Sequence, residues 1–341
     1  MIKELEKGLR LQEIGSIKIG GKGEKRTSQG GKEWRLPTKL DHFIITTKQR
    51  NSAGDFIQDM DVHKKIGLEP KKLKIRLLYD DIDLNFNTNY VYYHGKTCLC
   101  RGDGEFALRR TKDGILNEIQ CDREKCEFAV PDPKNKGIVR CKWFGRLQCI
   151  LDETNIIGGV HTFRTTSINS IFNVVSSLKF IQSVTGGMLA GLPLEMTISP
   201  KTVTPEGVGT TTIYVINIIF PGSTESLLTS IIGIAERRMV SGVKLREIQE
   251  AAKIGGLLTS HFEQEEEEIR DITDEFYPEG VEVEVVASEI IESKPLKPKE
   301  ANGNGENGGN GNNGDDKNGD NGKTKKAAQE SVDIFEGMNI L

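Results

Sequence analysis

The chain has 341 residues, of which 36% are hydrophobic and 28% charged, and its formal net charge is −4. That length suffices for about two compact domains with real cores. No stretch approaches the length of a membrane-spanning apolar segment, and the first residues lack the apolar run of a secretory signal. We therefore expect a soluble protein in a reducing cytoplasm, where clustered thiols stay reduced or bind metal.

Charge is divided unevenly along the chain. Residues 1–76 hold 18 Lys and Arg against 10 Asp and Glu, and residues 96–179 hold 14 against 10. Residues 262–341 reverse this balance, with 8 basic against 21 acidic residues. A basic front half favours an anionic partner such as nucleic acid, whereas an acidic end favours a basic surface on another protein or on the chain itself. Solvated faces are the alternative interpretation.

Residues 1–36 are rich in glycine and basic residues, and we expect a basic flexible arm there. Gly20-Gly21-Lys22-Gly23 is not a phosphate loop, because no Gly-Lys-Ser/Thr follows it. Basic residues in such an arm are candidates for contacts to a nucleic-acid backbone. The candidates are Lys18, Lys22, Lys25, Arg26, Lys32 and Arg35.

Apolar alternation and β-branched residues predict a β-rich core in two parts, residues 37–97 and 150–222, on either side of a cysteine-rich segment at 98–149. Ser167 should be the N-cap of a helix, because apolar residues recur after it at helical spacing. The expected strands are 40–47, 73–79, 90–94, 97–100, the part of 140–151 after Gly145, and 160–164, followed by a hairpin of 192–203 and 210–220.

The C-terminal part changes character twice. Residues 223–300 are helical and acidic in pattern, whereas residues 301–330 are an Asn- and Gly-rich linker with too little apolar surface to fold. Residues 331–341 combine acidic and apolar side chains at the end of this linker, which is typical of a docking peptide; a frayed terminus is the alternative. The candidate docking residues are Ile334, Phe335, Met338, Ile340 and Leu341.

Together these patterns predict an α+β fold. Runs of strands followed by runs of helices favour a mainly antiparallel sheet over a doubly wound nucleotide-binding sheet. We expect a cysteine-rich, zinc-stapled insertion in the sheet, helices after it and a disordered acidic tail.

All six cysteines lie between Cys98 and Cys149. The charged loops in this segment offer few residues to bury, and four thiolates around Zn²⁺ are a common substitute for a core. A site made of four cysteines leaves no position for water, so the zinc would be structural. Cys149 lies in an apolar strand and should be a core thiol, and Cys98 is a possible substitute for Cys100. Reduced structural thiols are the alternative; the preferred zinc ligands are Cys100, Cys121, Cys126 and Cys141.

Catalytic motifs are missing from the sequence. It contains no Gly-x-Ser-x-Gly, no His-Glu-x-x-His and no phosphate loop. Asp80, Asp81 and Asp83 form an acidic group that could bind a divalent cation, although such a loop is more often solvated. We expect a protein that is not an enzyme, with a metal-dependent nuclease as a minor alternative.

Several phrases resemble a known family when they are taken in order along the chain. They are IGSIKIG, LPTKLDHFIITT, LKIRLLYDDIDLNF, CLCRGDGE, CKWFGRLQCIL, FRTTSINSI and TGGMLAGLPLEMTISPKTV, between about Ile14 and Phe220. They resemble the recombination-directionality-factor-like family of phages and prophages. The resemblance implies a protein in a bacterial host that binds a large serine integrase on DNA and switches it toward excision. It also implies a zinc-binding cysteine cluster, with ligands at the four cysteines preferred above.

Two functions from different classes follow from the sequence. The first, which the resemblance implies, is a non-enzymatic regulator of site-specific recombination, whose partners are a large serine integrase and DNA. The second is a single-stranded nucleic-acid-binding protein, because a basic β-rich body, a low-complexity linker and an acidic-apolar tip are typical of such proteins. In that case strand aromatics would stack on bases, and the candidates are Tyr90, Tyr92, Tyr93, Trp143 and Phe144.

Overall fold

The computed structural model describes residues 11–27, 33–52, 55–95, 97–131, 139–154, 156–204 and 210–254, together with 269, 272, 273 and 275–277. The described residues all belong to the first of two units into which the chain divides, residues 1–296. The predicted linker and docking tip, including Ile334, Phe335, Met338, Ile340 and Leu341, lie outside the described residues.

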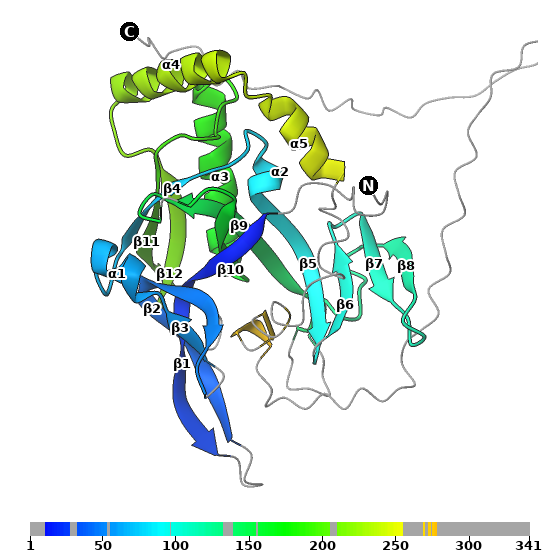
Figure 1. Ribbon diagram of the computed structural model, residues 1–341. Helices are drawn as coiled ribbons and strands as arrows, with labels where there is room; N and C mark the ends of the chain where they lie inside the picture. The colour runs from blue at the N-terminus through cyan, green and yellow to red at the C-terminus, as the bar shows by residue number, and fades with distance from the viewer. Residues whose placement is uncertain are drawn as a thin grey trace, which may run out of the picture. The chain divides into compact units, whose positions relative to one another are not determined.

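The described part of the first unit is an α+β fold with a mainly antiparallel sheet (Figure 1). The strands are β1 Gln12–Thr27, β2 Glu33–Arg50, β3 Phe56–Gln58, β4 Lys72–Arg76, β5 Phe86–His94, β6 Thr97–Gly102, β7 Phe106–Arg110, β8 Leu116–Gln120, β9 Lys142–Leu151, β10 Gly159–Thr165, β11 Leu194–Val203 and β12 Thr211–Ile219. The helices are α1 Met60–Ile66, α2 Ile82–Asn85, α3 Ile168–Val184, α4 Thr224–Ser241 and α5 Leu245–Ile254.

The strands follow the order β3-β2-β1-β10-β9-β5-β6-β7-β8, and β4, β11 and β12 join the sheet beside β9. The contact between β1 and β10 is parallel, whereas the other strand pairs are antiparallel. The strands predicted after Gly145 and at 160–164 are present as β9 and β10, which pair with each other. The predicted hairpin is also confirmed, as β11 and β12.

The prediction of a flexible arm at residues 1–36 is wrong for much of this segment. Residues 12–27 and 33–36 belong to β1 and β2, which pair from Gly15 opposite Thr47 to Thr27 opposite Glu33. Ile17 and Ile19 enter the same core as Phe43 and Ile45. The glycines and lysines hide this period-two pattern, because only two large apolar side chains mark it.

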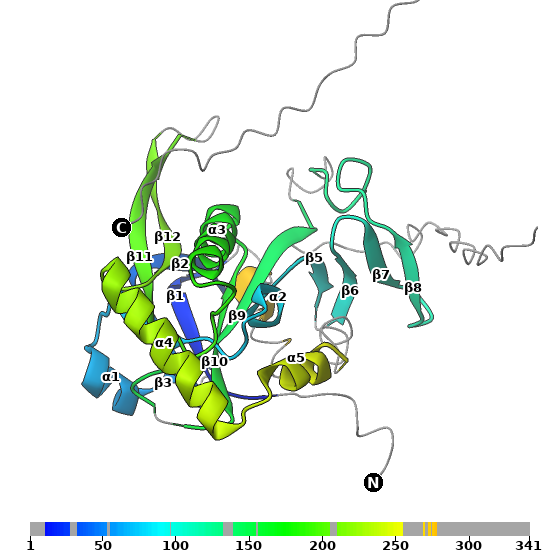
Figure 2. The same cartoon turned by 90° about the horizontal axis from the view of Figure 1, so that it is seen from above.

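Helix α3 packs on the main hydrophobic core and contacts β9 and β12. Figure 2 shows the helix between these strands. Its predicted N-cap is confirmed: the Ser167 side chain accepts a hydrogen bond from the Ser170 backbone N–H. One expected boundary is wrong, since β9 begins at Lys142 and continues through Gly145. A Cβ at Gly145 would lie 2.6 Å from the Phe86 ring, so the glycine is needed for close packing inside the strand.

A buried charge cluster joins β1 to the middle of the sheet. The Glu13 carboxylate accepts hydrogen bonds from the Arg164 guanidinium at 3.1 Å and from Lys48 Nζ at 3.2 Å, and Arg146 lies 3.9 Å away. The side chains of Glu13 and Arg164 are only 10% and 3% exposed. Burial opposes ionisation of Glu13, but Arg164 and the other two cations hold its pKa well below the usual range.

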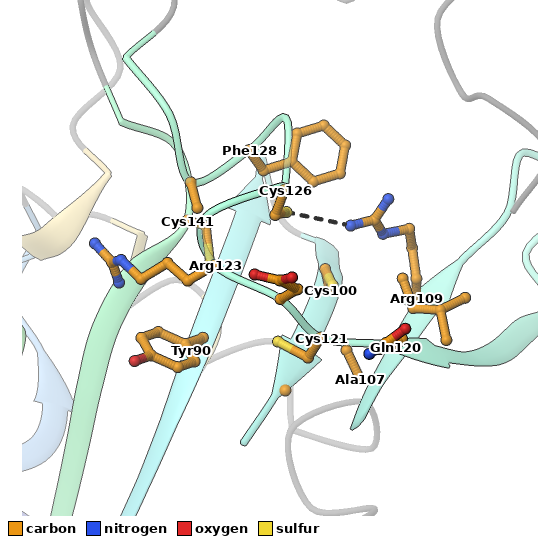
Figure 3. Close-up of a pocket in the computed structure, with 14 residues that line it drawn as sticks. Tyr90, Cys100, Ala107, Arg109, Gln120, Cys121, Arg123, Cys126, Phe128 and Cys141 are labelled. Carbon is orange, nitrogen blue, oxygen red and sulfur yellow. Dashed lines mark hydrogen bonds between the residues drawn. The ribbon is translucent and has the colours of Figure 1, made fainter. Parts of the chain in front are cut away.

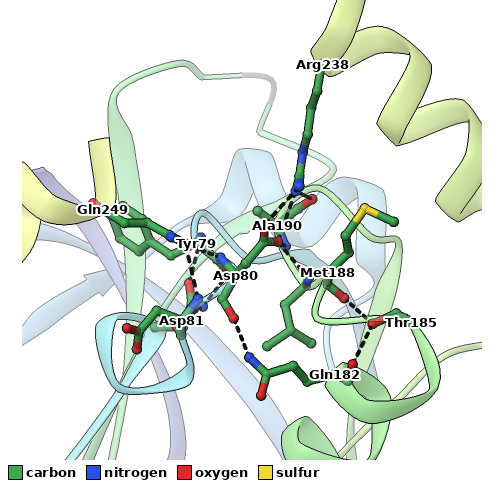
Figure 4. A network of polar contacts seen from close by, with 11 residues as sticks. Tyr79, Asp80, Asp81, Gln182, Thr185, Met188, Ala190, Arg238 and Gln249 are labelled. Carbon is green, nitrogen blue, oxygen red and sulfur yellow. Dashed lines mark hydrogen bonds and ion pairs between the residues drawn. The ribbon is translucent and has the colours of Figure 1, made fainter. Parts of the chain in front are cut away.

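The Asp80 side chain connects the segment after β4 to α4 (Figure 4). Its carboxylate accepts hydrogen bonds from the backbone N–H groups of Leu189 and Ala190, both at 2.8 Å, and forms an ion pair with Arg238 at 2.8 Å. The Asp80 backbone is bound as well, by Gln249 of α5 and Gln182 of α3. One residue therefore contacts three helices or their flanking loops.

We expect the substitution Asp80→Ala to lower the free energy of unfolding by about 1.5–3 kcal/mol, the usual range for a hydrogen bond to a charged group. The physical reason is that Arg238 and two backbone N–H groups lose their acceptor. Urea denaturation measures the change. Asp83→Ala is the matched control in the same acidic run, since Asp83 is exposed, and equal losses in both variants would contradict the role of Asp80.

Four residues near the end of the described chain pack against β5, β6 and β9; they are Ile269, Ile272, Phe276 and Tyr277. Ile272 is fully buried and packs with Val91, Tyr93 and Phe144. The Tyr277 hydroxyl donates to the Val91 carbonyl at 2.9 Å, and Lys18 Nζ lies 3.3 Å from Glu275. The apolar side chains at 269, 272 and 276, within the region predicted to be helical and acidic, therefore pack against their own unit. In the part of the chain that is described, no helix is long and apolar enough to cross a membrane.

Candidate metal centre

The six cysteines lie on different elements of the region from β6 to β9. Cys98 and Cys100 are in β6, Cys149 is in β9, and the other three are in the connections: Cys121 after β8, Cys126 in the following turn and Cys141 just before β9. All six are free thiols. The arrangement therefore leaves every sulfur available as a ligand in principle.

Four of these thiols line one pocket (Figure 3). They are Cys100, Cys121, Cys126 and Cys141, the same four that the sequence predicts as ligands. Backbone hydrogen bonds fix the connections that carry them. The Cys121 N–H donates to the Glu105 carbonyl at 2.9 Å, and the Cys141 N–H donates to the Phe128 carbonyl at 2.6 Å. Cysteines up to 41 residues apart in the sequence, Cys100 and Cys141, therefore line the same pocket.

A glycine makes room for this cluster. A Cβ at Gly102 would lie 2.6 Å from Cys121 Sγ and 2.8 Å from the Ala107 side chain. Any larger residue at this position would displace the thiol or the neighbouring strand. The sequence shows Gly102 only as part of the phrase CLCRGDGE, and nothing in its spacing indicates this role.

The residue types that line the pocket fit a zinc ion, although their donor atoms do not form a coordination group as they stand. Four sulfur donors are the usual set for structural zinc. Within the described ranges, no three His, Cys, Asp or Glu side chains form a group that could hold a metal ion as they stand. Two buried guanidinium nitrogens, Arg109 Nε and Arg123 Nη1, have no hydrogen-bond partner there. Both side chains line the pocket, and unpaired buried cationic donors favour an anionic cluster such as a tetrathiolate.

Burial opposes ionisation of three of these thiols, Cys100, Cys121 and Cys141. Burial and the neighbouring Cys100 and Cys126 together raise the pKa of Cys141 to about 12. Burial also raises the pKa of Cys121. A bound divalent cation reverses this balance, because it stabilises the thiolate form of its ligands.

A comparison with protein families identifies the group to which the chain belongs. The model of the Gp3-like family, described as recombination directionality factor-like, matches residues 14–221, well over half of the chain. The chain belongs to the recombination directionality factor-like family. A search of curated proteins found no match, and a search of solved structures found none. The match runs from β1 to the end of β12 and includes every cysteine.

The other two cysteines, Cys98 and Cys149, do not line the pocket. Tyr92 pairs with Cys100 and the next residue, Tyr93, pairs with Cys98, so a bulge in β6 interrupts the alternation. Cys98 consequently packs with Tyr93, whereas Cys100 packs with Tyr92. Cys149 is fully buried in the main core, as expected, and burial raises its pKa to about 12.

The predicted nucleic-acid contacts are spread along the β1–β2 hairpin. Lys18 forms an ion pair with Glu275 and lies 4.9 Å from the Phe56 ring centroid. The backbones of Lys22, Lys25, Arg26 and Arg35 belong to the paired strands, while Lys32 lies outside the described residues. The structure thus brings five of the six candidates onto one hairpin, and one of them, Lys18, has an acidic partner within the chain.

The candidate stacking aromatics divide into two groups. Tyr92, Tyr93 and Phe144 are buried in packed clusters, so they cannot stack on a base without unfolding. Tyr90 and Trp143 are partly exposed and contact each other, with a centroid distance of 4.6 Å, beneath the Arg123 guanidinium. The sequence pattern does not separate these groups, because both occur in β-strands.

In the acidic group at 80–83, Asp80 and Asp81 make contacts that stabilise the fold. The Asp80 carboxylate binds two backbone N–H groups and Arg238, as described above. Asp81 caps α2 and forms an ion pair with Lys253 at 2.9 Å. These contacts, which the sequence does not reveal, use the carboxylates that a cation would need.

Proposed function

We propose that this protein regulates site-specific recombination by binding a large serine integrase on DNA and biasing it toward excision. The observation that carries the proposal is the family match over residues 14–221. The action is stoichiometric and non-enzymatic. The basic residues of the β1–β2 hairpin are the proposed contacts to DNA, and residues 331–341 are the proposed docking peptide for a protein partner.

Zinc is part of this proposal. Cys100, Cys121, Cys126 and Cys141 would hold a structural Zn²⁺, which connects the β6–β8 region to the start of β9. Support comes from the pocket that the four thiols share and from their chemistry. The ion would supply rigidity to a surface that partners recognise and would leave no open position for a reactant.

A reconstituted recombination assay tests the proposal. A large serine integrase from the same phage or prophage is incubated with excision and integration substrates, with and without the purified protein. We expect the ratio of excision to integration to rise with protein concentration and to level off at a stoichiometric ratio to integrase. An unchanged ratio, together with no binding to the integrase, would refute the proposed function.

Two control measurements separate the alternatives. Labelled single-stranded oligonucleotides test binding without sequence preference, which would favour the single-stranded nucleic-acid-binding function if its affinity falls steeply with salt. Incubation of DNA with Mg²⁺ or Mn²⁺ tests a nuclease. We expect intact DNA, since the Asp80 and Asp81 carboxylates are already used in internal contacts.

A further inference from the structure

Arg109 of β7 reaches from its strand toward the four-cysteine pocket. Its Nη2 lies 3.5 Å from Cys126 Sγ, with the guanidinium group donating, as the dashed line in Figure 3 shows. On the neighbouring strand Cys100 is its direct cross-strand partner. One arginine therefore stands beside two of the four proposed ligands.

The guanidinium group of Arg109 is held in place by the residues that follow Cys126. Nη1 donates to the Glu127 carboxylate at 3.3 Å, and the guanidinium carbon lies 4.6 Å from the Phe128 ring centroid. An ion pair and a cation–π contact thus fix the plane of the group. Its remaining donor, Nε, is buried and has no partner among the described residues.

Charge explains what such an arginine would do. Zn²⁺ with four thiolates carries a net charge of −2, and burying an uncompensated charge is costly. A guanidinium donor beside a ligating sulfur lowers this cost and orients the thiolate, as outer hydrogen bonds do around other protein metal sites. A fixed planar donor does this better than a lysine, whose ammonium is a mobile, strongly hydrated point charge.

We propose that Arg109 is a positioning residue for the zinc site: it donates to the Cys126 thiolate, offsets part of the negative charge and fixes the turn that carries this ligand. The inference rests on the zinc proposed above. Nothing in the sequence distinguishes Arg109 from its neighbour Arg110, since both lie in a stretch whose structure the sequence leaves ambiguous.

Zinc affinity tests the inference in the full chain. Zinc-loaded wild type, Arg109→Gln and Arg109→Lys are titrated with a chromophoric chelator. We expect Arg109→Gln to lose about 10–100-fold in zinc affinity, as is usual for outer hydrogen-bond partners of a metal ligand, and Arg109→Lys to lose less. Arg110→Gln is the matched control, because Arg110 donates to the Gly114 carbonyl on the exposed side of the same hairpin.

A spectroscopic measurement separates a change at the thiolate from a general loss of stability. In the Co²⁺-loaded protein we expect the sulfur-to-cobalt charge-transfer band to shift in Arg109→Gln and to stay unchanged in Arg110→Gln. Circular dichroism verifies that each variant is folded. If Arg109→Gln unfolds, the same shift and affinity loss are required of Arg109→Lys, in smaller degree.

The possible failures are distinguishable. Wild-type affinity and an unshifted band in Arg109→Gln, with zinc lost in Cys126→Ser, would overturn the role of Arg109 and leave the zinc site standing. Wild-type protein without zinc would overturn both. Integrase binding is measured separately in the recombination assay, so a failure of the zinc site and a failure of the proposed regulation of recombination give different results.

Discussion

Glu13→Gln is expected to lower the free energy of unfolding by about 3–5 kcal/mol, the usual loss when one partner of a buried ion pair is removed. The Arg164 side chain, which is 3% exposed, would lose the carboxylate that accepts its hydrogen bonds. Lys48 and Arg146 lose the same partner, so three cations on one face of the sheet would face a neutral amide. Urea denaturation at neutral pH measures the loss.

The same cluster predicts how stability depends on pH. The pKa of Glu13 is lower in the folded protein than its ordinary value of 4.5, so its contribution is complete above that pH and is lost as the pH falls below it. Wild type should therefore lose more stability than Glu13→Gln on acidification. Asp61→Asn is the control, since Asp61 and Lys64 are an exposed pair, and its stability should remain close to that of wild type. Parallel curves for wild type and Glu13→Gln would contradict the prediction.

The sequence predicts those parts of the fold that local signals specify. Ser167 caps α3 with its side-chain oxygen as predicted, and the helical pattern predicted from residue 223 corresponds to α4. The β11–β12 hairpin likewise follows from two apolar strands around a turn. Such features depend on residues close in sequence, and propensity and capping describe them well.

Long-range packing accounts for what the sequence does not predict. Composition alone suggests an arm at residues 1–36, but β1 gains a parallel neighbour in β10, about 145 residues further along the chain. That pairing, and the Glu13–Arg164 contact beside it, become visible only when the fold is known. Gly145 shows the same limit: it looks like a strand boundary, yet it lies inside β9 because the Phe86 ring packs onto its backbone.

At the candidate metal centre, residue chemistry predicts more than strand geometry does. Sequence reasoning selects four of six cysteines, and these four line one pocket. The alternation of a regular strand, however, puts Cys98 and Cys100 on one side, and the bulge beside Tyr92 and Tyr93 separates them. Arg109 was not predicted at all, since its position beside Cys126 depends on the pairing of β6 with β7.

Cys126→Ser should abolish stoichiometric zinc binding, because a serine hydroxyl is a much poorer zinc ligand than a thiolate. Structural zinc sites of four cysteines contribute directly to folding, and in isolated zinc-finger peptides this contribution is about 10–16 kcal/mol. Here the sheet core is separate, so we expect local unfolding of residues 98–141 while α3 and the β11–β12 hairpin stay folded. Metal analysis and hydrogen exchange measure the two effects.

Cys98→Ala and Cys149→Ala are the matched controls, because both thiols are buried and neither lines the pocket. Each should retain one zinc per chain, although Cys149→Ala should lower overall stability by leaving a small cavity in the core. Loss of zinc in Cys98→Ala with retention in Cys100→Ser would instead make Cys98 the ligand from β6. Near-zero zinc in wild-type protein purified without chelators would refute the metal site. The raised thiol pKa values would then describe a set of reduced structural cysteines.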